Sequence, residues 1–316
     1  MLLMHTKPKV CREQILQRFP GIELATVTTI KDLTLTLEAH RPEVVLSFKL
    51  DGMTVDALRP LMSDPFVKWI HNAGAGVDHF PPWDAGAVTV TNASGVLSNA
   101  MTEYVVASLL MMNIGFARYQ RQQAAREWRI NPWQSVRGRT LLVVGLGNIG
   151  RRVAERAQQL GMHVIGVRSR PEPVAGVDTV ITAEQLYAGI SRADFIAVHV
   201  PLTSRTCRLI DAAAIACMQP HAVLINTSRG GVVDEEALHE ALRARRIKGA
   251  VVDVFHHEPL PVDSPLWDLD NIVITPHMAD AVEGWEERMT DYFGDNLERW
   301  LARQPLENVV DAERGY

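Results

Sequence analysis

Short apolar runs alternate along this chain with segments that repeat apolar residues at every third or fourth position. An apolar run bounded by Gly, Pro or Asp predicts a buried strand, and helical spacing predicts a helix packed on the strands. The predicted strands are residues 43–48, 67–70, 88–90, 140–144, 163–167, 195–199, 222–226, 250–253 and 272–274. Helical patterns, such as residues 234–242, lie between the later strands. This alternation predicts an α/β protein with parallel, doubly wound sheets.

Two longer segments have a stronger apolar character. Residues 101–115 are apolar nearly all round, apart from Thr102 and Glu103, which predicts a helix buried at a domain or subunit boundary. Residues 281–303 place large apolar side chains three or four positions apart, which predicts one wide apolar face that packs on a core. Because the central strands are flanked by further segments on both sides, we expect this helix to return to the N-terminal domain.

A glycine loop joins the predicted strand at 140–144 to a predicted helix at 149–160. The loop contains Gly145, Gly147, Asn148, Ile149 and Gly150. In a dinucleotide fingerprint the first glycine allows a tight turn, the second lets the backbone approach a pyrophosphate, and the third lets the helix pack on the strand. The free N–H groups of the helix N-terminus favour an anion. The loop therefore predicts a nicotinamide dinucleotide site, although a glycine-rich turn without a ligand has the same local pattern.

The end of the next strand bears on the choice of cofactor. NAD enzymes usually place an acidic residue there, against the ribose 2′-hydroxyl. This chain has Arg168, Ser169 and Arg170 instead. Guanidinium groups match phosphate geometry with paired N–H donors, so we predict NADP(H), with NAD(H) as the alternative. The opposing interpretation is that both arginines are solvated surface residues.

Length, charge and cysteines narrow the class of protein. A chain of 316 residues exceeds what one core usually organises, which predicts two domains. A net charge of −5 argues against nucleic acid or an anionic membrane as a partner. Three cysteines without metal-ligand spacing indicate reduced thiols and no metal site. The apolar segments are too short for a secretory leader or a membrane span, so we expect a cytoplasmic protein.

Polar turns follow four of the predicted strands. They are 199–203, 226–231, Asp253 and 275–277. Any one of them is readily explained as an ordinary turn with a satisfied polar side chain. Ligands in open parallel sheets bind at the carboxyl edge, and four such turns together favour a ligand site there.

Several spaced motifs now match one family. They are Asn72–Asp78, Gly145–Gly150, His199–Thr203, Ile225–Gly231, Asp253–Leu260 and Thr275–His277. The chain resembles the D-isomer-specific 2-hydroxyacid dehydrogenases, and within them the glyoxylate and hydroxypyruvate reductases. The resemblance implies a Rossmann cofactor domain inserted into a flavodoxin-like substrate domain. It predicts a substrate domain formed by residues 1–98 and 282–316, and a dinucleotide-binding domain formed by residues 99–281.

The resemblance assigns three catalytic roles. Arg229 matches the arginine that holds the substrate carboxylate and polarises its carbonyl, for which a planar guanidinium is suited. His277 matches the general acid and base, and histidine is the side chain that titrates near neutrality. Glu258 matches the carboxylate that orients the imidazole and stabilises its protonated form. The opposing interpretation of Glu258 is a surface glutamate in a loop.

The resemblance also predicts binding residues. Ala73, Gly74, Ala75 and Gly76 match a small-residue loop whose backbone N–H groups face the substrate carboxylate. Arg229 and His277 complete the predicted substrate contacts. Besides the glycine loop and residues 168–170, the predicted cofactor contacts are His199, Val200, Pro201, Thr227, Ser228, Arg229, Asp253 and His277.

Together these observations predict NAD(P)H-dependent reduction of a small 2-oxo acid, such as glyoxylate or hydroxypyruvate, to the D-2-hydroxy acid. Formate is disfavoured, because formate dehydrogenases of the superfamily carry glutamine where Glu258 stands. The alternative is a dinucleotide-binding corepressor of the same fold with little turnover. Trp128 and Trp133 lie where relatives make their subunit contact, so we expect a homodimer if both are exposed.

Overall fold

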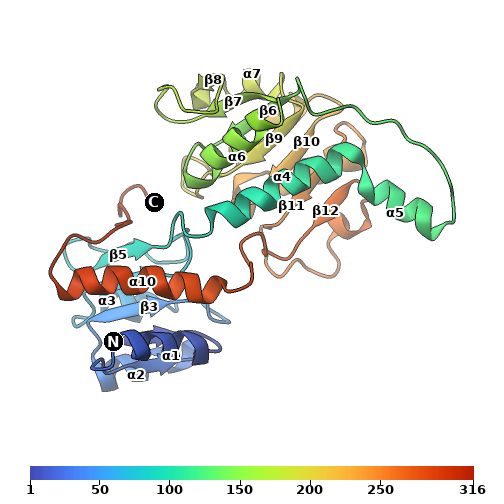
Figure 1. Cartoon of the computed structure of the whole chain (residues 1–316). Helices are drawn as coiled ribbons and strands as arrows, with labels where there is room; N and C mark the ends of the chain where they lie inside the picture. Colours follow the sequence, from blue (N-terminus) through green and yellow to red (C-terminus); the bar gives the residue numbers. More distant parts are fainter. The chain divides into compact units, whose positions relative to one another are not determined.

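The computed structural model describes residues 1–316, and the chain forms two compact units (Figure 1). Unit 1 comprises Met1–Leu97 and Val282–Tyr316, and unit 2 comprises Ser98–Ala281. Ser98 was expected to end the first segment of the substrate domain. It is instead the first residue of helix α4 (Ser98–Ile114) and is grouped with unit 2.

Unit 1 contains a parallel sheet of five strands in the order β2-β1-β3-β4-β5. The strands are β1 (Leu2–Met4), β2 (Ala25–Val27), β3 (Val44–Ser47), β4 (Trp69–Asn72) and β5 (Thr89–Asn92). This order is that of flavodoxin-like sheets, which confirms the predicted fold class for this part of the chain. Its helices are α1 (Lys9–Arg18), α2 (Leu33–His40), α3 (Arg59–Ser63) and α10 (Trp285–Leu301), with a 3-10 turn η1 (Ile30–Asp32).

Helix α10 returns to the N-terminal segment, as the apolar pattern suggested. Phe293 on α10 stacks on Trp69 of β4, with ring centroids 5.3 Å apart. Arg18 at the end of α1 pairs with Asp295 and Glu298 at 2.7 and 2.8 Å. The helix begins later than predicted because Gly284, with a φ of 72°, turns the chain at its N-terminus.

Unit 2 contains a parallel sheet of seven strands in the order β12-β11-β10-β9-β6-β7-β8. The strands are β6 (Thr140–Val144), β7 (His163–Val167), β8 (Thr179–Ile181), β9 (Phe195–Val198), β10 (Val223–Asn226), β11 (Gly249–Val252) and β12 (Ile272–Ile274). Counted from β6, this is the Rossmann order with one further strand, and the order reverses between β6 and β9. Both faces of the sheet are buried against apolar clusters.

The connections of unit 2 are mostly helical. Besides α4 they are α5 (Phe116–Ala124), α6 (Asn148–Gln159), α7 (Leu186–Ile190), α8 (Ala212–Ala216), α9 (Glu235–Arg243), η2 (Ala183–Gln185), η3 (Gly230–Val232) and η4 (Pro265–Asp268). No single helix is long and apolar enough to span a membrane. Helices α4 and α5 have the required length and hydropathy only when they are taken together, and the chain bends by 59° between them.

Candidate active site

Arg229 lies in the turn after β10, at the carboxyl edge of the unit 2 sheet. The side chain of Asn226 shapes this turn: its carbonyl oxygen accepts hydrogen bonds from the Ser228 N–H and hydroxyl, at 3.1 and 2.7 Å. Its amide donates to the Arg229 carbonyl oxygen at 3.3 Å. The Arg229 Nη1 donates to the Ser228 carbonyl oxygen at 2.8 Å, which holds one end of the guanidinium against this turn.

The turn after β10 lies against the loop after β11 because Gly230 has no side chain. A Cβ at Gly230 would lie 2.0 Å from the carbonyl carbon of Phe255. No other residue fits in this space. The close approach places Arg229 beside the loop that carries Glu258.

Glu258 and His277 form a hydrogen-bonded ion pair. Glu258 Oε2 lies 2.7 Å from His277 Nδ1, and Glu258 Oε1 accepts from the Phe255 N–H at 3.1 Å. Both carboxylate oxygens are therefore held, and the imidazole has a fixed orientation. With Nδ1 engaged, Nε2 is the nitrogen left for proton exchange with a ligand.

The Asp253 carboxylate holds the backbone around His277 in place through hydrogen bonds. It accepts from the Thr275 hydroxyl at 2.6 Å and from the N–H groups of Met278 and Ala279 at 2.9 and 3.0 Å. The His277 N–H donates to the Asp253 carbonyl oxygen at 2.8 Å. His277 has a φ of 51°, a left-handed conformation that such a network must hold in place. Asp253, predicted as a cofactor contact, is thus buried and largely committed to this turn.

Two residues that the sequence analysis did not single out extend this site. Tyr104 of α4 donates its hydroxyl proton to Thr275 Oγ1 at 2.6 Å, since the Thr275 hydroxyl itself donates to Asp253. Asp280 is half-buried, and burial raises its pKa; the charges of His277 and Arg229 act in the opposite direction. Asp280 therefore lies within electrostatic range of both. Its position three residues after His277 was the available signal.

The fingerprint has the geometry of a phosphate-binding turn. Gly145 has a φ of 100°, and a Cβ there would lie 2.8 Å from Val200 Cγ1. A Cβ at Gly150 would lie 1.9 Å from the Gly145 carbonyl oxygen, so helix α6 packs tightly on the turn. Gly147 faces open space, and no side chain caps the N-terminus of α6. These features fit a dinucleotide pyrophosphate at the N-terminus of α6, beginning at Asn148 and Ile149.

The predicted 2′-phosphate residues follow β7, the strand next to β6. Arg168 Nη2 lies 3.7 Å from the Glu172 carboxylate, and the side chain remains partly exposed. Ser169 and Arg170 stand beside it, and Arg170 is exposed. Since Glu172 is itself exposed, this contact is weak, and either guanidinium is free to turn to a phosphate.

His199 and Thr227 meet across the carboxyl ends of β9 and β10. His199 Nδ1 lies 3.3 Å from Thr227 Oγ1, and burial lowers the pKa of His199 to about 4. The imidazole is therefore neutral at physiological pH, and its buried Nε2 has no hydrogen-bond partner within the chain. Val200 and Pro201 continue from His199 beside Gly145. An unpaired polar atom next to the fingerprint is a further feature that fits a bound dinucleotide.

In unit 1, the predicted substrate loop follows β4. The Asn72 amide donates to the carbonyl oxygens of Gly74 and Gly76, both at 2.9 Å, and the Asn92 amide donates to that of Ala75 at 2.7 Å. The carbonyl groups therefore point into unit 1. The N–H groups of residues 74–76 make no hydrogen bond within the chain, which leaves them as donors for an anion.

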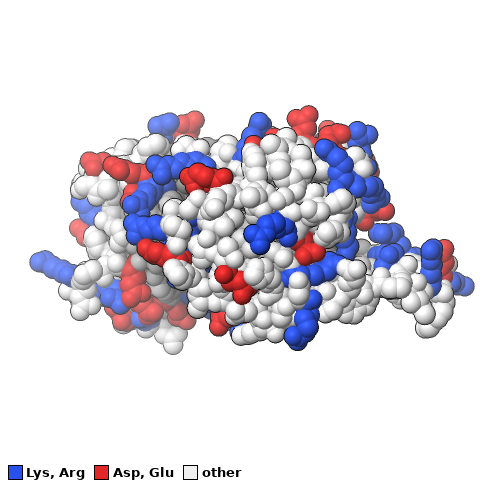
Figure 2. Space-filling view, turned by 90° about the horizontal axis from the view of Figure 1, so that it is seen from above, with Lys and Arg blue, Asp and Glu red and all other residues white.

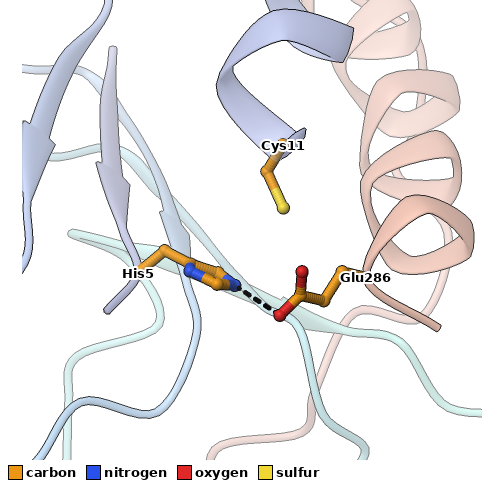
Figure 3. A group of neighbouring side chains, drawn as sticks. All are labelled: His5, Cys11 and Glu286. Atoms are coloured by element: carbon orange, nitrogen blue, oxygen red, sulfur yellow. Dashed lines mark ion pairs between the residues drawn. The ribbon is translucent and has the colours of Figure 1, made fainter. Parts of the chain in front are cut away.

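A separate cluster in unit 1 has the residue types of a metal site. His5, Cys11 and Glu286 come together as shown in Figure 3, with His5 Nε2 3.2 Å from Glu286 Oε1. The Lys7 N–H donates to His5 Nδ1 at 2.9 Å, so the ring proton is on Nε2, the nitrogen that a metal would need. Burial raises the pKa of the Cys11 thiol, which opposes the thiolate form. The contact between His5 and Glu286 therefore links the residue that follows β1 to helix α10.

Comparison with known proteins places the chain in a family. Residues 106–279 match the family model described as D-isomer specific 2-hydroxyacid dehydrogenase, NAD binding domain. The chain is 34% identical over 310 residues to the D-3-phosphoglycerate dehydrogenase of Methanocaldococcus jannaschii, covering 94% of this chain and 57% of that protein. It is 34% identical over 281 residues to the glyoxylate reductase of Korarchaeum cryptofilum, covering 82% of this chain and 83% of that one.

The fold is also that of solved members. The NADPH-dependent glyoxylate/hydroxypyruvate reductase of Sinorhizobium meliloti, in complex with NADP and sulfate, superimposes with a TM-score of 0.84 at 26% identity, covering 100% of this chain and 99% of that one. The chain belongs to the D-isomer specific 2-hydroxyacid dehydrogenase family. It spans little more than half the length of the phosphoglycerate dehydrogenases it matches.

Proposed function

We propose that the protein reduces a small 2-oxo acid to the D-2-hydroxy acid with NADPH. The observation that carries this proposal is the 2.7 Å contact between Glu258 Oε2 and His277 Nδ1, at the sheet edge where Arg229 also lies. A paired imidazole beside a guanidinium suits carbonyl reduction, because one group donates a proton while the other stabilises negative charge on oxygen.

When bound at the Gly145–Gly150 turn, a reduced nicotinamide dinucleotide would supply the hydride that C2 of the substrate accepts. The Arg229 guanidinium holds the substrate carboxylate and donates to the carbonyl oxygen, which draws electron density from C2. The protonated His277 transfers its Nε2 proton to that oxygen, so the C=O bond becomes CH–OH. Glu258 stabilises the imidazolium before transfer and keeps the ring in position afterwards.

The preference for NADPH rests on the side chains after β7. Arg168 and Arg170 supply two guanidiniums, no acidic side chain occupies the ribose position within residues 168–170, and Ser169 adds a hydroxyl donor. The Sinorhizobium meliloti reductase, a relative by structure, was solved with NADP. NAD(H) remains the alternative cofactor, with affinity limited by the absence of an acceptor for the 2′-hydroxyl.

The substrate class is tested by a panel of 2-oxo acids, from glyoxylate and hydroxypyruvate to phenylpyruvate, assayed with each coenzyme. We expect loss of the NADPH absorbance band with the smaller acids and a D-configured product. Tight binding of NADPH without turnover on any acid would contradict the proposal. That outcome is the one expected of a corepressor-like protein of the same fold.

We further propose a homodimer that uses the segment following α5. In this segment Trp128 is 99% exposed, Ile130 is 84% exposed and Trp133 is 53% exposed. Apolar side chains this exposed are costly in water and are typical of a surface that a second copy covers. Sedimentation of the wild type and of Trp128→Ser tests this: the wild type should sediment as a dimer, and the variant should dissociate at higher concentration.

A further inference from the structure

A series of hydrogen bonds runs from helix α4 to the turn at residues 277–279. The Tyr104 hydroxyl lies 2.6 Å from Thr275 Oγ1, and the Thr275 hydroxyl lies 2.6 Å from Asp253 Oδ1. The Asp253 carboxylate in turn accepts the two N–H groups that follow His277, at 2.9 and 3.0 Å. All of these residues belong to unit 2, where α4 packs against β10 and β11 (Figure 1). The series therefore joins a long helix to the backbone of the proposed general acid.

Each hydroxyl proton in this series has one available direction. An ionised carboxylate only accepts hydrogen bonds, so the Thr275 hydroxyl donates to Asp253 and the Tyr104 hydroxyl donates to Thr275. Burial raises the pKa of the Tyr104 hydroxyl, and hydrogen bonds with Thr275 and Ser108 act in the opposite direction. Tyr104 therefore keeps its proton at neutral pH and remains a donor to Thr275.

The backbone that this series holds has a conformation that histidine rarely adopts. His277 has a φ of 51°, which is unfavourable for a residue with a side chain, so the surrounding hydrogen bonds must maintain it. The Asp253 carboxylate supplies two such bonds directly after His277, and the Asp253 carbonyl oxygen accepts the His277 N–H at 2.8 Å. The position of His277 Nε2 follows from this backbone and from the contact of Nδ1 with Glu258.

We infer that Tyr104 is a positioning residue for the proposed general acid, His277. Acting through Thr275 and Asp253, its hydroxyl keeps the turn after β12 in the conformation that presents Nε2 to the substrate carbonyl. The inference rests on the proposed function, in which His277 protonates the carbonyl oxygen. A displacement of a catalytic group by about 1 Å can slow a reaction about 10²-fold, even when its cause is remote from the reacting atoms.

The alternative role of Tyr104 is to fill space beside the core of unit 2. Its ring packs against the apolar cluster that α4 shares with the sheet, and a role in packing alone would need the ring but not the hydroxyl. The variant Y104F separates the two roles, because it removes the oxygen and keeps the ring. It also leaves every charge in place, including the surface charges of both signs that Figure 2 shows, so long-range attraction of charged ligands is unchanged.

Steady-state kinetics of Y104F test the inference. We expect kcat for the 2-oxo acid to fall about tenfold, whereas the KM for NADPH and the Tm stay close to those of the wild type. The matched control Y187F removes another hydroxyl of unit 2, which donates to the Asp211 carboxylate at 2.9 and 3.0 Å, and should keep the wild-type kcat. Since T275V interrupts the same series, the double variant Y104F/T275V should lose no more than T275V alone.

Amide hydrogen exchange gives a second measurement, which does not need turnover. The N–H groups of Met278 and Ala279 should exchange faster in Y104F than in the wild type, and at the wild-type rate in Y187F. A wild-type kcat in Y104F would overturn the inference, and so would a lower kcat without faster exchange at these two N–H groups. A wild type that reduces no 2-oxo acid would refute the proposed function instead, and the exchange rates would still decide whether Tyr104 holds the turn.

Discussion

At the scale of single residues, the sequence motifs located the candidate site but not its supporting contacts. Arg229, Glu258 and His277 each follow a separate strand, and their residue types indicated the chemistry. The pairing of Glu258 with His277 depends on a 19-residue separation that only the fold closes. Asp280 and Tyr104 were missed because neither belongs to a motif: Asp280 is a single acid three residues after His277, and Tyr104 lies within the apolar helix α4.

Replacing Glu258 with Gln tests the ion pair. The carboxylate 2.7 Å from Nδ1 holds the His277 ring in one orientation, with Nε2 left for the ligand. In E258Q, kcat/KM for the 2-oxo acid should therefore fall about tenfold or more, because an amide does not hold the ring in the same tautomer. Steady-state kinetics of E258Q measure this loss, and an unchanged kcat/KM would refute the pairing.

His71 gives a stability prediction that is independent of catalysis. Burial in the unit 1 core lowers its pKa to about 3, from an ordinary value of 6.5. Between these values the unfolded chain takes up a proton that the native chain excludes. The stabilisation is therefore complete above pH 6.5 and is lost on acidification, by about 1.4 kcal/mol per pH unit.

The H71N variant keeps an amide for the Thr91 hydroxyl, which lies 2.7 Å from Nδ1 in the wild type, and removes the titration. Urea unfolding between pH 6.5 and 4.5 should show a smaller loss of stability in H71N than in the wild type. Parallel pH dependences for the two proteins would show that His71 titrates normally.

At the scale of elements, nine of the twelve strands were predicted from their apolar runs, and β1, β2 and β8 were not. In unit 2 the missed strand, β8, is three residues long and half-exposed at the sheet edge. In unit 1, β1 and β2 are also only three residues long. A segment of three residues is too short to show the alternation of apolar and polar positions that indicates a strand, and its pairing is set by the neighbouring strands.

Glycines of the fingerprint give a paired test at this scale. A Cβ at Gly147 meets nothing within 4 Å, so G147A should fold with a stability close to that of the wild type. The added methyl group should hinder approach of the pyrophosphate to the backbone and weaken NADPH binding about tenfold or more. Fluorescence titration of NADPH and thermal unfolding measure the two effects.

Gly21 provides the matched control, because it too has open space around its Cβ position but lies in unit 1. G21A should bind NADPH as the wild type does. If G147A also binds NADPH normally, the loop is a structural turn and not a phosphate site.

At the scale of the whole molecule, the order of strands in both sheets agrees with the fold class predicted from the alternation of elements and from the family motifs. Each unit has its own core, and helix α10 joins the last part of the chain to the first. Cofactor preference could not be settled by pattern alone. Arg168 and Arg170 provide cations, but whether they turn towards a phosphate depends on competition with Glu172.

The double variant R168Q/R170Q tests the origin of cofactor preference. If the guanidiniums bind the 2′-phosphate, their removal should raise the KM for NADPH about tenfold or more and leave the KM for NADH nearly unchanged. The ratio of kcat/KM for the two coenzymes measures this effect. An equal change for both coenzymes would show that the two arginines do not discriminate between them.

The most direct test of the central claim is the rate of NADPH oxidation with glyoxylate by the wild type and by H277Q at neutral pH. If His277 is the general acid, the variant should bind NADPH normally and lose about 10²- to 10⁴-fold in kcat. A variant that turns over at the wild-type rate would contradict the account, because the proton must then come from another group.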